Sequence, residues 1–263
     1  MNDIVNEIFG NQFMDKFHDY NNPDSLWRYQ HRQRAKIISE QIDKRARFKS
    51  SFLDAGAGRG AYSNFATNIF HKVYVFELDK NELFKSKKNL NQISKTEFIF
   101  DNVDLRNIPL PNESIDLIIL SEVIEHVPDE QKALKEVNRV LKPNGIIIFS
   151  MPNSWSFYWQ HQRLLFKYAR ANNLSGYSDW EAKRHFSFSF LAIRNLIKSE
   201  NFKIIKTTGC TIIPLFPLLY GNLYKKFPSL LRFYSKIDEK LSRYFPFLCA
   251  SYFLILSKKR VKN

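Results

Sequence analysis

The sequence has little cysteine and no long apolar run, and both shortages narrow the possible classes of protein. Its two cysteines, Cys210 and Cys249, lie far apart with no CxxC spacing, which excludes a disulfide framework and a cysteine-rich zinc site. We therefore expect a reducing, cytoplasmic setting. The N-terminal stretch MNDIVNEIFG carries acids and no apolar core, so no secretory signal is expected. The most apolar stretch, 211–224, contains prolines and a glycine and is shorter than the roughly 20 apolar residues of a membrane-spanning helix.

Acidic residues are scarce at the C-terminal end of the chain. The 263 residues carry a formal net charge of +14. Residues 201–263 hold twelve Lys and Arg against two acids, whereas 51–150 is close to neutral. This asymmetry indicates an acidic partner at that end, which is phosphate, nucleic acid or an anionic membrane surface. A solvated lysine-rich face is the plain alternative, but the same stretch is also rich in aromatic residues.

Short apolar runs alternate with polar, helix-length segments from Ser51 onward. This alternation favours an α/β protein with a parallel sheet covered by helices on both sides. The predicted strands are 51–55, 72–78, 97–103, 115–121, 145–151, 203–209 and 250–259. The predicted helices are 25–47, 61–70, 80–92, 129–141 and 190–202.

The stretch LDAGAGRG (53–60) places three glycines between a predicted strand and a predicted helix. Gly56, Gly58 and Gly60 allow a tight turn and a close approach of backbone N–H groups to a ligand. Glu77 ends the next strand, where a carboxylate can accept hydrogen bonds from both ribose hydroxyls. Asp54, at the end of the first strand, is placed to orient the other end of the ligand. Together these residues predict a cofactor that contains a nucleoside.

These motifs resemble those of the class I S-adenosylmethionine-dependent methyltransferases. LDAGAGRG is similar to the first motif of that family, D-x-G-x-G-x-G, and VFELD to the second. NVDLRNIPLPNESIDLIILSEVIEHV resembles the third and fourth motifs, and VLKPNGIIIFSMPN the strand that follows them. The resemblance runs from about Ser51 to Met151. It implies S-adenosylmethionine as cofactor and a Rossmann-like, doubly wound, mostly parallel seven-stranded sheet with a final antiparallel strand.

The resemblance also implies roles for single residues. Glu77 matches the acid that binds the ribose, Asp104 the acid near the adenine amino group, and Leu105 the backbone contact to the adenine ring. Ser121 is a further candidate for cofactor binding at the end of a core strand. The sequence departs from the family at DNVDL, where a glycine is common before the acid, so the adenine contact is less firmly predicted than the ribose contact.

Three ionisable residues, Glu122, Glu125 and His126, follow the apolar strand IDLIIL in the stretch LSEVIEHV. A buried charge is costly unless it is paired, hydrogen-bonded or bound to a metal. Offsets of three and four bring these side chains together if the chain turns helically. The stretch then has three interpretations: a cap for the next helix, a catalytic site with His126 as general base, or a site for Mg²⁺ or Mn²⁺.

The metal interpretation, which we favour over a bare histidine base, has a family parallel. E-x-x-E-H resembles the pattern of ubiquinone-biosynthesis O-methyltransferases. It is also similar to that of small-RNA 2′-O-methyltransferases, in which a downstream histidine completes a metal site. His185 is the candidate here, although its spacing to the next helix is about one residue short of that pattern. A histidine beside phenylalanines is also common in protein cores.

The chain is longer than a minimal fold of this kind. We expect a helical extension at 1–50 and a methyltransferase domain at 51–263 with insertions at 152–184 and 214–248. Both insertions mix aromatic with basic residues, which fits a membrane-interface surface, a substrate lid or, less well, a nucleic-acid site.

The predicted function is methylation, on oxygen, of an apolar, lipid-linked or glycosidic small molecule at or near a membrane. One alternative is a metal-dependent RNA 2′-O-methyltransferase. The other is a membrane-associated protein that binds S-adenosylmethionine without catalysis.

Overall fold

The computed structural model describes residues 26–45, 50–90, 95–160, 163–164, 167, 188–212 and 228–258. The strands are β1 (Ser51–Ala55), β2 (Lys72–Phe76), β3 (Glu97–Asp101), β4 (Ile115–Ser121), β5 (Leu141–Pro152), β6 (Phe202–Cys210) and β7 (Ser251–Lys258). The α-helices of eight or more residues are α3 (Leu26–Arg45), α5 (Lys80–Leu90), α6 (Glu130–Val140), α9 (Phe190–Ser199) and α11 (Pro228–Tyr244). Shorter helices are α4 (Ala61–Phe65) and the 3₁₀ turns η1 (Ile124–His126) and η2 (Pro246–Leu248).

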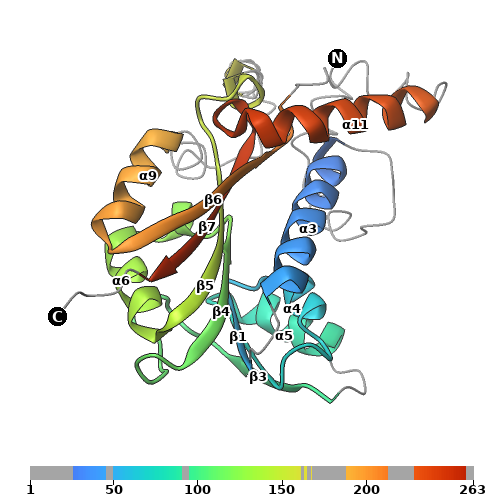
Figure 1. Ribbon diagram of the computed structural model, residues 1–263. Coiled ribbons are helices and arrows are strands. Elements are labelled where there is room, and N and C mark those ends of the chain that lie inside the picture. The colour runs from blue at the N-terminus through green and yellow to red at the C-terminus, as the bar shows by residue number, and fades with distance from the viewer. Residues whose placement is uncertain are drawn as a thin grey trace. The chain divides into compact units, whose positions relative to one another are not determined.

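The described strands form one seven-stranded sheet in the order β3-β2-β1-β4-β5-β7-β6. The pairs β1–β2, β1–β4, β2–β3 and β4–β5 are parallel. The last strand, β7, runs in the opposite direction (Figure 1). Helices α4 and α5 lie on one side of the sheet, and α6 and α9 lie on the other (Figure 1). The predicted fold class is therefore confirmed: a mostly parallel, doubly wound sheet with a final antiparallel strand.

The core explains why the central strands are continuously apolar. Leu117, Ile118, Ile119 and Leu120 of β4 are all fully buried, because helices cover both faces of the sheet. Full burial of such a side chain contributes roughly 1.5–3 kcal/mol.

Helix α6 covers the sheet through one apolar face. Its buried residues are Ala133, Leu134, Val137 and Val140. Its start is fixed by the side chain of Asp129, which accepts a hydrogen bond from the backbone N–H of Lys132 at 2.9 Å. This helix confirms the one predicted at 129–141.

The chain divides into two compact units, which we describe separately. The sheet unit comprises 36–151, 191–207 and 253–263, and the second unit comprises 1–35, 152–190 and 208–252. Both predicted insertions fall within the ranges of the second unit, and the predicted boundary at residue 50 stays a prediction. No helix in the described part of the chain is long and apolar enough to cross a membrane.

Candidate active site

The glycine loop links β1 to α4 at the carboxyl edge of the sheet. Gly56, Gly58 and Gly60 all have positive φ angles, of 78°, 53° and 79°. A Cβ atom on Gly56 would lie 2.6 Å from Cγ2 of Val123, so this position excludes any larger residue. A Cβ on Gly58 would meet no heavy atom within 4 Å. The loop is thus tightly packed at Gly56 and open at Gly58, which leaves room for a ligand to approach the backbone there.

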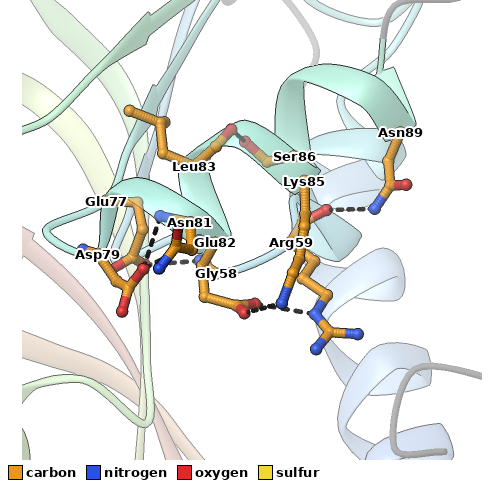
Figure 2. Close-up of polar contacts among 10 residues, drawn as sticks. All are labelled: Gly58, Arg59, Glu77, Asp79, Asn81, Glu82, Leu83, Lys85, Ser86 and Asn89. Atoms are coloured by element: carbon orange, nitrogen blue, oxygen red, sulfur yellow. Dashed lines mark hydrogen bonds and ion pairs between the residues drawn. The ribbon is translucent and has the colours of Figure 1, made fainter. Parts of the chain in front are cut away.

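Glu77 follows β2 and is tied directly to this loop. Its Oε2 accepts a hydrogen bond from the backbone N–H of Gly58 at 2.7 Å, and its Oε1 accepts one from the N–H of Asp79 at 3.0 Å (Figure 2). Each carboxylate oxygen has two lone pairs, so both oxygens retain capacity to accept another hydrogen bond. Glu77 is therefore held in place and still able to bind a pair of ribose hydroxyls.

Helix α5 fixes the loop from its other side (Figure 2). The Nε of Arg59 lies 2.9 Å from Oε2 of Glu82, whose other oxygen accepts from Nζ of Lys85 at 2.7 Å. The side-chain amide of Asn89 donates to the carbonyl of Arg59 at 3.0 Å. Gly60 packs so closely on this helix that a Cβ atom there would lie 2.7 Å from Cδ1 of Leu90. This support was not predicted, because Glu82, Lys85, Asn89 and Leu90 lie outside the recognised motifs.

Asp54 lies at the end of β1 and is almost completely buried. Burial raises the pKa of its carboxyl to about 6, although a hydrogen bond from the Ser63 hydroxyl at 2.6 Å acts in the opposite direction. Glu77 contributes a smaller upward shift through like charge. Asp54 therefore titrates close to neutral pH and would be stabilised as a carboxylate by a nearby cationic group, such as the ammonium of an amino-acid ligand.

Asp104 follows β3 and forms a bidentate pair with Arg106. Nε and Nη2 of Arg106 lie 3.0 Å and 2.5 Å from Oδ2 of Asp104. The hydrogen bonds from Arg106 lower the pKa of Asp104, so this side chain remains a carboxylate. Leu105 is buried beside it. The carboxylate can accept a further hydrogen bond from an adenine amino group. Its partner within the protein, Arg106, was not predicted.

At the end of β4, Ser121 and Glu122 are joined to β5. The hydroxyl oxygens of Ser121 and Ser150 lie 2.7 Å apart, and Ser150 donates to Oε1 of Glu122 at 3.2 Å. The backbone N–H of Glu122 also donates to the carbonyl of Ser150 at 3.0 Å. Glu122 has a φ of 56°, so the chain bends sharply here. Ser150 was missed because sequence alone does not give the register between β4 and β5.

Glu125 and His126 lie in the 3₁₀ turn η1. The Glu125 side chain is 1% exposed, whereas that of His126 is 41% exposed. The Nε2 of His126 and the Oε1 of Glu125 are 4.0 Å apart. An accessible imidazole is thus backed by a buried carboxylate, an arrangement that can orient a histidine and stabilise it when it takes up a proton.

The predicted metal site is not assembled by this geometry. Among the described residues, no group of three or more His, Cys, Asp or Glu side chains is placed to hold a metal ion. The predicted grouping assumed an α-helical turn, in which offsets of three and four share a face. The actual turn is 3₁₀ and follows a residue of positive φ, so Glu125 points inward, His126 outward, and Glu122 toward Ser150. His185, the predicted fourth ligand, lies outside the described residues.

Residues 53–149 match the family described as "Methyltransferase domain". An uncharacterized protein of Methanocaldococcus jannaschii is 27% identical over 215 residues, which are 76% of this chain and 81% of that protein. A ubiquinone biosynthesis O-methyltransferase of Coxiella burnetii is 29% identical over 121 residues, 46% of this chain and 50% of that protein. The chain thus spans only about half the length of the Coxiella relative.

The fold has counterparts among solved structures. The crystal structure of a Thermotoga maritima protein described as an S-adenosylmethionine-dependent methyltransferase, possible histamine N-methyltransferase, superposes with a TM-score of 0.60. The alignment covers 97% of this chain and 99% of that one at 17% identity, a level that shows the fold alone. The motifs, the fold and the family match agree: residues 53–149 form a methyltransferase domain, and the chain resembles S-adenosylmethionine-dependent methyltransferases.

Proposed function

We propose that this methyltransferase methylates a hydroxyl oxygen on an apolar, lipid-linked or glycosidic small molecule. The observation that carries the proposal is the pair formed by exposed His126 and buried Glu125 at the carboxyl edge of the sheet. A hydroxyl is a weak nucleophile until it loses its proton, so transfer to oxygen benefits from a general base. The bound cofactor supplies a methyl group already activated on a sulfonium sulfur.

In this proposal the chain provides position and proton transfer. The glycine loop and Glu77 would hold the nucleoside, and Asp54 would interact with the amino-acid end of the cofactor. His126 takes the proton from the acceptor hydroxyl, and the Glu125 carboxylate stabilises the imidazolium that forms. The remaining requirement is an in-line arrangement of oxygen, methyl carbon and sulfur, which is a matter of positioning. Because the described acids and histidine do not form a metal site, no step is assigned to a metal ion.

The apolar character of the acceptor has two supports. A relative that matches part of the chain is named as a ubiquinone biosynthesis O-methyltransferase. The stretch after β5 also exposes large apolar side chains, with Trp155 at 71% and Phe157 at 65% exposure. Such residues favour contact with an apolar ligand over contact with water.

The test is turnover with methyl-labelled S-adenosylmethionine against separate lipid, glycan and RNA fractions. We expect the label in the lipid or glycan fraction, in a product that withstands mild base as a methyl ether does. The variant His126→Ala should bind the cofactor normally and transfer little label. Label found mainly in RNA, or on nitrogen in the product, would contradict the proposal.

A further inference from the structure

Helix α11 exposes an apolar stripe although it belongs to a folded unit. Phe233 is 64% exposed, Ile237 37% and Tyr244 70%. These residues are spaced by four and seven positions, so they share one side of the helix. Two more aromatic residues continue the exposed surface beyond the helix, with Phe245 at 43% and Phe247 at 51% exposure. A contiguous exposed apolar patch of this kind usually marks an interaction site, whereas single exposed apolar residues are common on any protein surface.

The opposite side of α11 is anchored, which fixes the side that faces solvent. Asp238 is fully buried, and its Oδ1 accepts a hydrogen bond from the backbone N–H of Ile212 at 2.7 Å. Ser242, one turn later, is 2% exposed. Asp238 and Ser242 thus face the protein, whereas Phe233, Ile237 and Tyr244 face outward. In an ordinary surface helix the apolar stripe faces the core, so these outward apolar residues need a cause other than the core of this unit.

Basic residues flank the stripe. Lys236, Lys240 and Arg243 are all exposed, and helical spacing places them along one edge of the apolar residues. The acids of α11 offset only the charge of Arg243 and leave that of Lys236 and Lys240 on the outer face. Asp238 is buried, and Glu239 pairs with Arg243 at 2.7 Å. We call Phe233, Lys236, Ile237, Lys240, Arg243 and Tyr244 together the α11 surface.

We propose that the α11 surface binds anionic membrane lipid, with the helix lying in the plane of the interface. Its aromatic and aliphatic stripe would enter the region between headgroups and acyl chains, and its lysines and arginine would meet lipid phosphates. The combination of an apolar stripe and a basic edge on one helix is the pattern of interfacial helices. RNA fits less well, because Ile237 offers no ring for base stacking. This inference concerns a surface that the methyl transfer does not use, so it stands apart from the proposed function.

The test is flotation of the full-length protein with vesicles of phosphatidylcholine alone or mixed with phosphatidylglycerol. We expect binding to the mixed vesicles, weak binding to phosphatidylcholine alone, and release as salt rises, because ions screen exposed charge. The variant Lys236→Glu with Lys240→Glu should bind at least about tenfold more weakly, because each basic residue near an anionic surface contributes several-fold to binding. Phe233→Ala with Ile237→Ala and Tyr244→Ala should weaken binding to a similar degree.

Matched controls separate this surface from general charge and general hydrophobicity. Lys203→Glu with Lys206→Glu makes the same change in net charge on exposed positions of β6, and Phe84→Ala removes an equally exposed aromatic, 70% exposed, from α5. Both should bind vesicles as the natural protein does. Equal loss in the controls, no preference for anionic vesicles, or binding of RNA without binding of vesicles would overturn the proposal. Circular dichroism and cofactor affinity confirm that each variant is folded.

Discussion

The backbone N–H of Gly58 donates to Oε2 of Glu77 across 2.7 Å, and this bond joins the loop after β1 to the end of β2. The glycine loop and Glu77, which are predicted to bind the cofactor, are therefore positioned together by a contact within the protein itself. Such preorganisation lowers the conformational entropy lost on binding. It also means that a change at Glu77 disturbs both the ribose contact and the loop.

Replacement of Glu77 should weaken cofactor binding strongly. Hydrogen bonds to a charged group contribute about 1.5–3 kcal/mol each, so Glu77→Ala should lower S-adenosylmethionine affinity by roughly tenfold or more. Titration calorimetry measures the effect. Glu97→Ala, at an exposed position of β3, is the matched control and should bind normally. Unchanged affinity in folded Glu77→Ala would remove this residue from the site.

Asp54 should make stability depend on pH in a defined window. Its folded-state pKa is raised from 3.8 to about 6, so the folded protein holds this proton more tightly than the unfolded chain. The contribution of Asp54 to stability is then fully present below about pH 4 and falls as the pH rises to about 6. The loss is at most about 3 kcal/mol, at about 1.4 kcal/mol for each pH unit.

The variant Asp54→Asn stays neutral and should lack this loss. Urea unfolding at several pH values measures the free energy of unfolding of both proteins. Between about pH 4 and 6 this free energy should rise for the variant relative to the natural protein. A constant difference across that range would contradict the raised pKa. A cationic ligand group beside Asp54 would also favour the carboxylate, so cofactor affinity should increase with pH over the same window in the natural protein alone.

Asp116 should be a stabilising residue rather than a functional one. Its Oδ2 accepts hydrogen bonds from the Ser51 hydroxyl and from Nζ of Lys142, each at 2.8 Å, which joins β4 to the start of β1 and to β5. Burial alone would raise its pKa, but these donors prevail and lower it to about 2. The stability that Asp116 supplies is therefore present above about pH 4 and is lost as the pH falls toward 2.

Asp116→Ala should lower the free energy of unfolding by about 1–3 kcal/mol at neutral pH, because it removes the acceptor of the Ser51 backbone N–H and of the partly buried Lys142 ammonium. Thermal and urea unfolding measure this change. Cofactor affinity of the folded variant should equal that of the natural protein. A large loss of cofactor affinity with unchanged stability would contradict the prediction, because it would show that Asp116 acts in cofactor binding and not in stabilising the fold.

The sequence predicted the fold and the tight glycine turns for identifiable physical reasons. Strands buried on both faces must be continuously apolar, as 115–121 is, and glycine is needed wherever φ is positive, as at Gly56 and Gly60. Both signals are local. The hydrogen-bond partners of the site residues are not given by local signals. The bonds from Arg106 to Asp104, from Ser63 to Asp54 and from Ser150 to Glu122 depend on side-chain direction and strand register. The grouping of Glu122, Glu125 and His126 stays a prediction, because spacing alone does not distinguish an α-helical turn from the 3₁₀ turn found here.

The roles of Glu122, Glu125 and His126 can be separated by two paired variants and a chelator. If His126 is the base, His126→Ala should remove most turnover and spare cofactor affinity. Glu122→Gln should retain most turnover, because Glu122 is bonded to Ser150 and is not part of the His126–Glu125 pair. Steady-state kinetics with the acceptor, alongside calorimetry with the cofactor, measure both effects.

Glu125 is expected to act on His126 rather than on the acceptor, because its side chain is only 1% exposed. Glu125→Gln should therefore lower kcat more than it raises KM, and it should shift the pH profile of kcat to lower pH, since a neutral amide no longer favours the imidazolium. A purely structural role would leave the pH profile of kcat of the folded fraction unchanged.

Chelation distinguishes the histidine base from a metal site. With a histidine base EDTA leaves turnover intact. Loss of activity with EDTA, rescue by Mg²⁺ and equal damage from Glu122→Gln and His126→Ala would instead mean that a metal assembles these side chains when it binds.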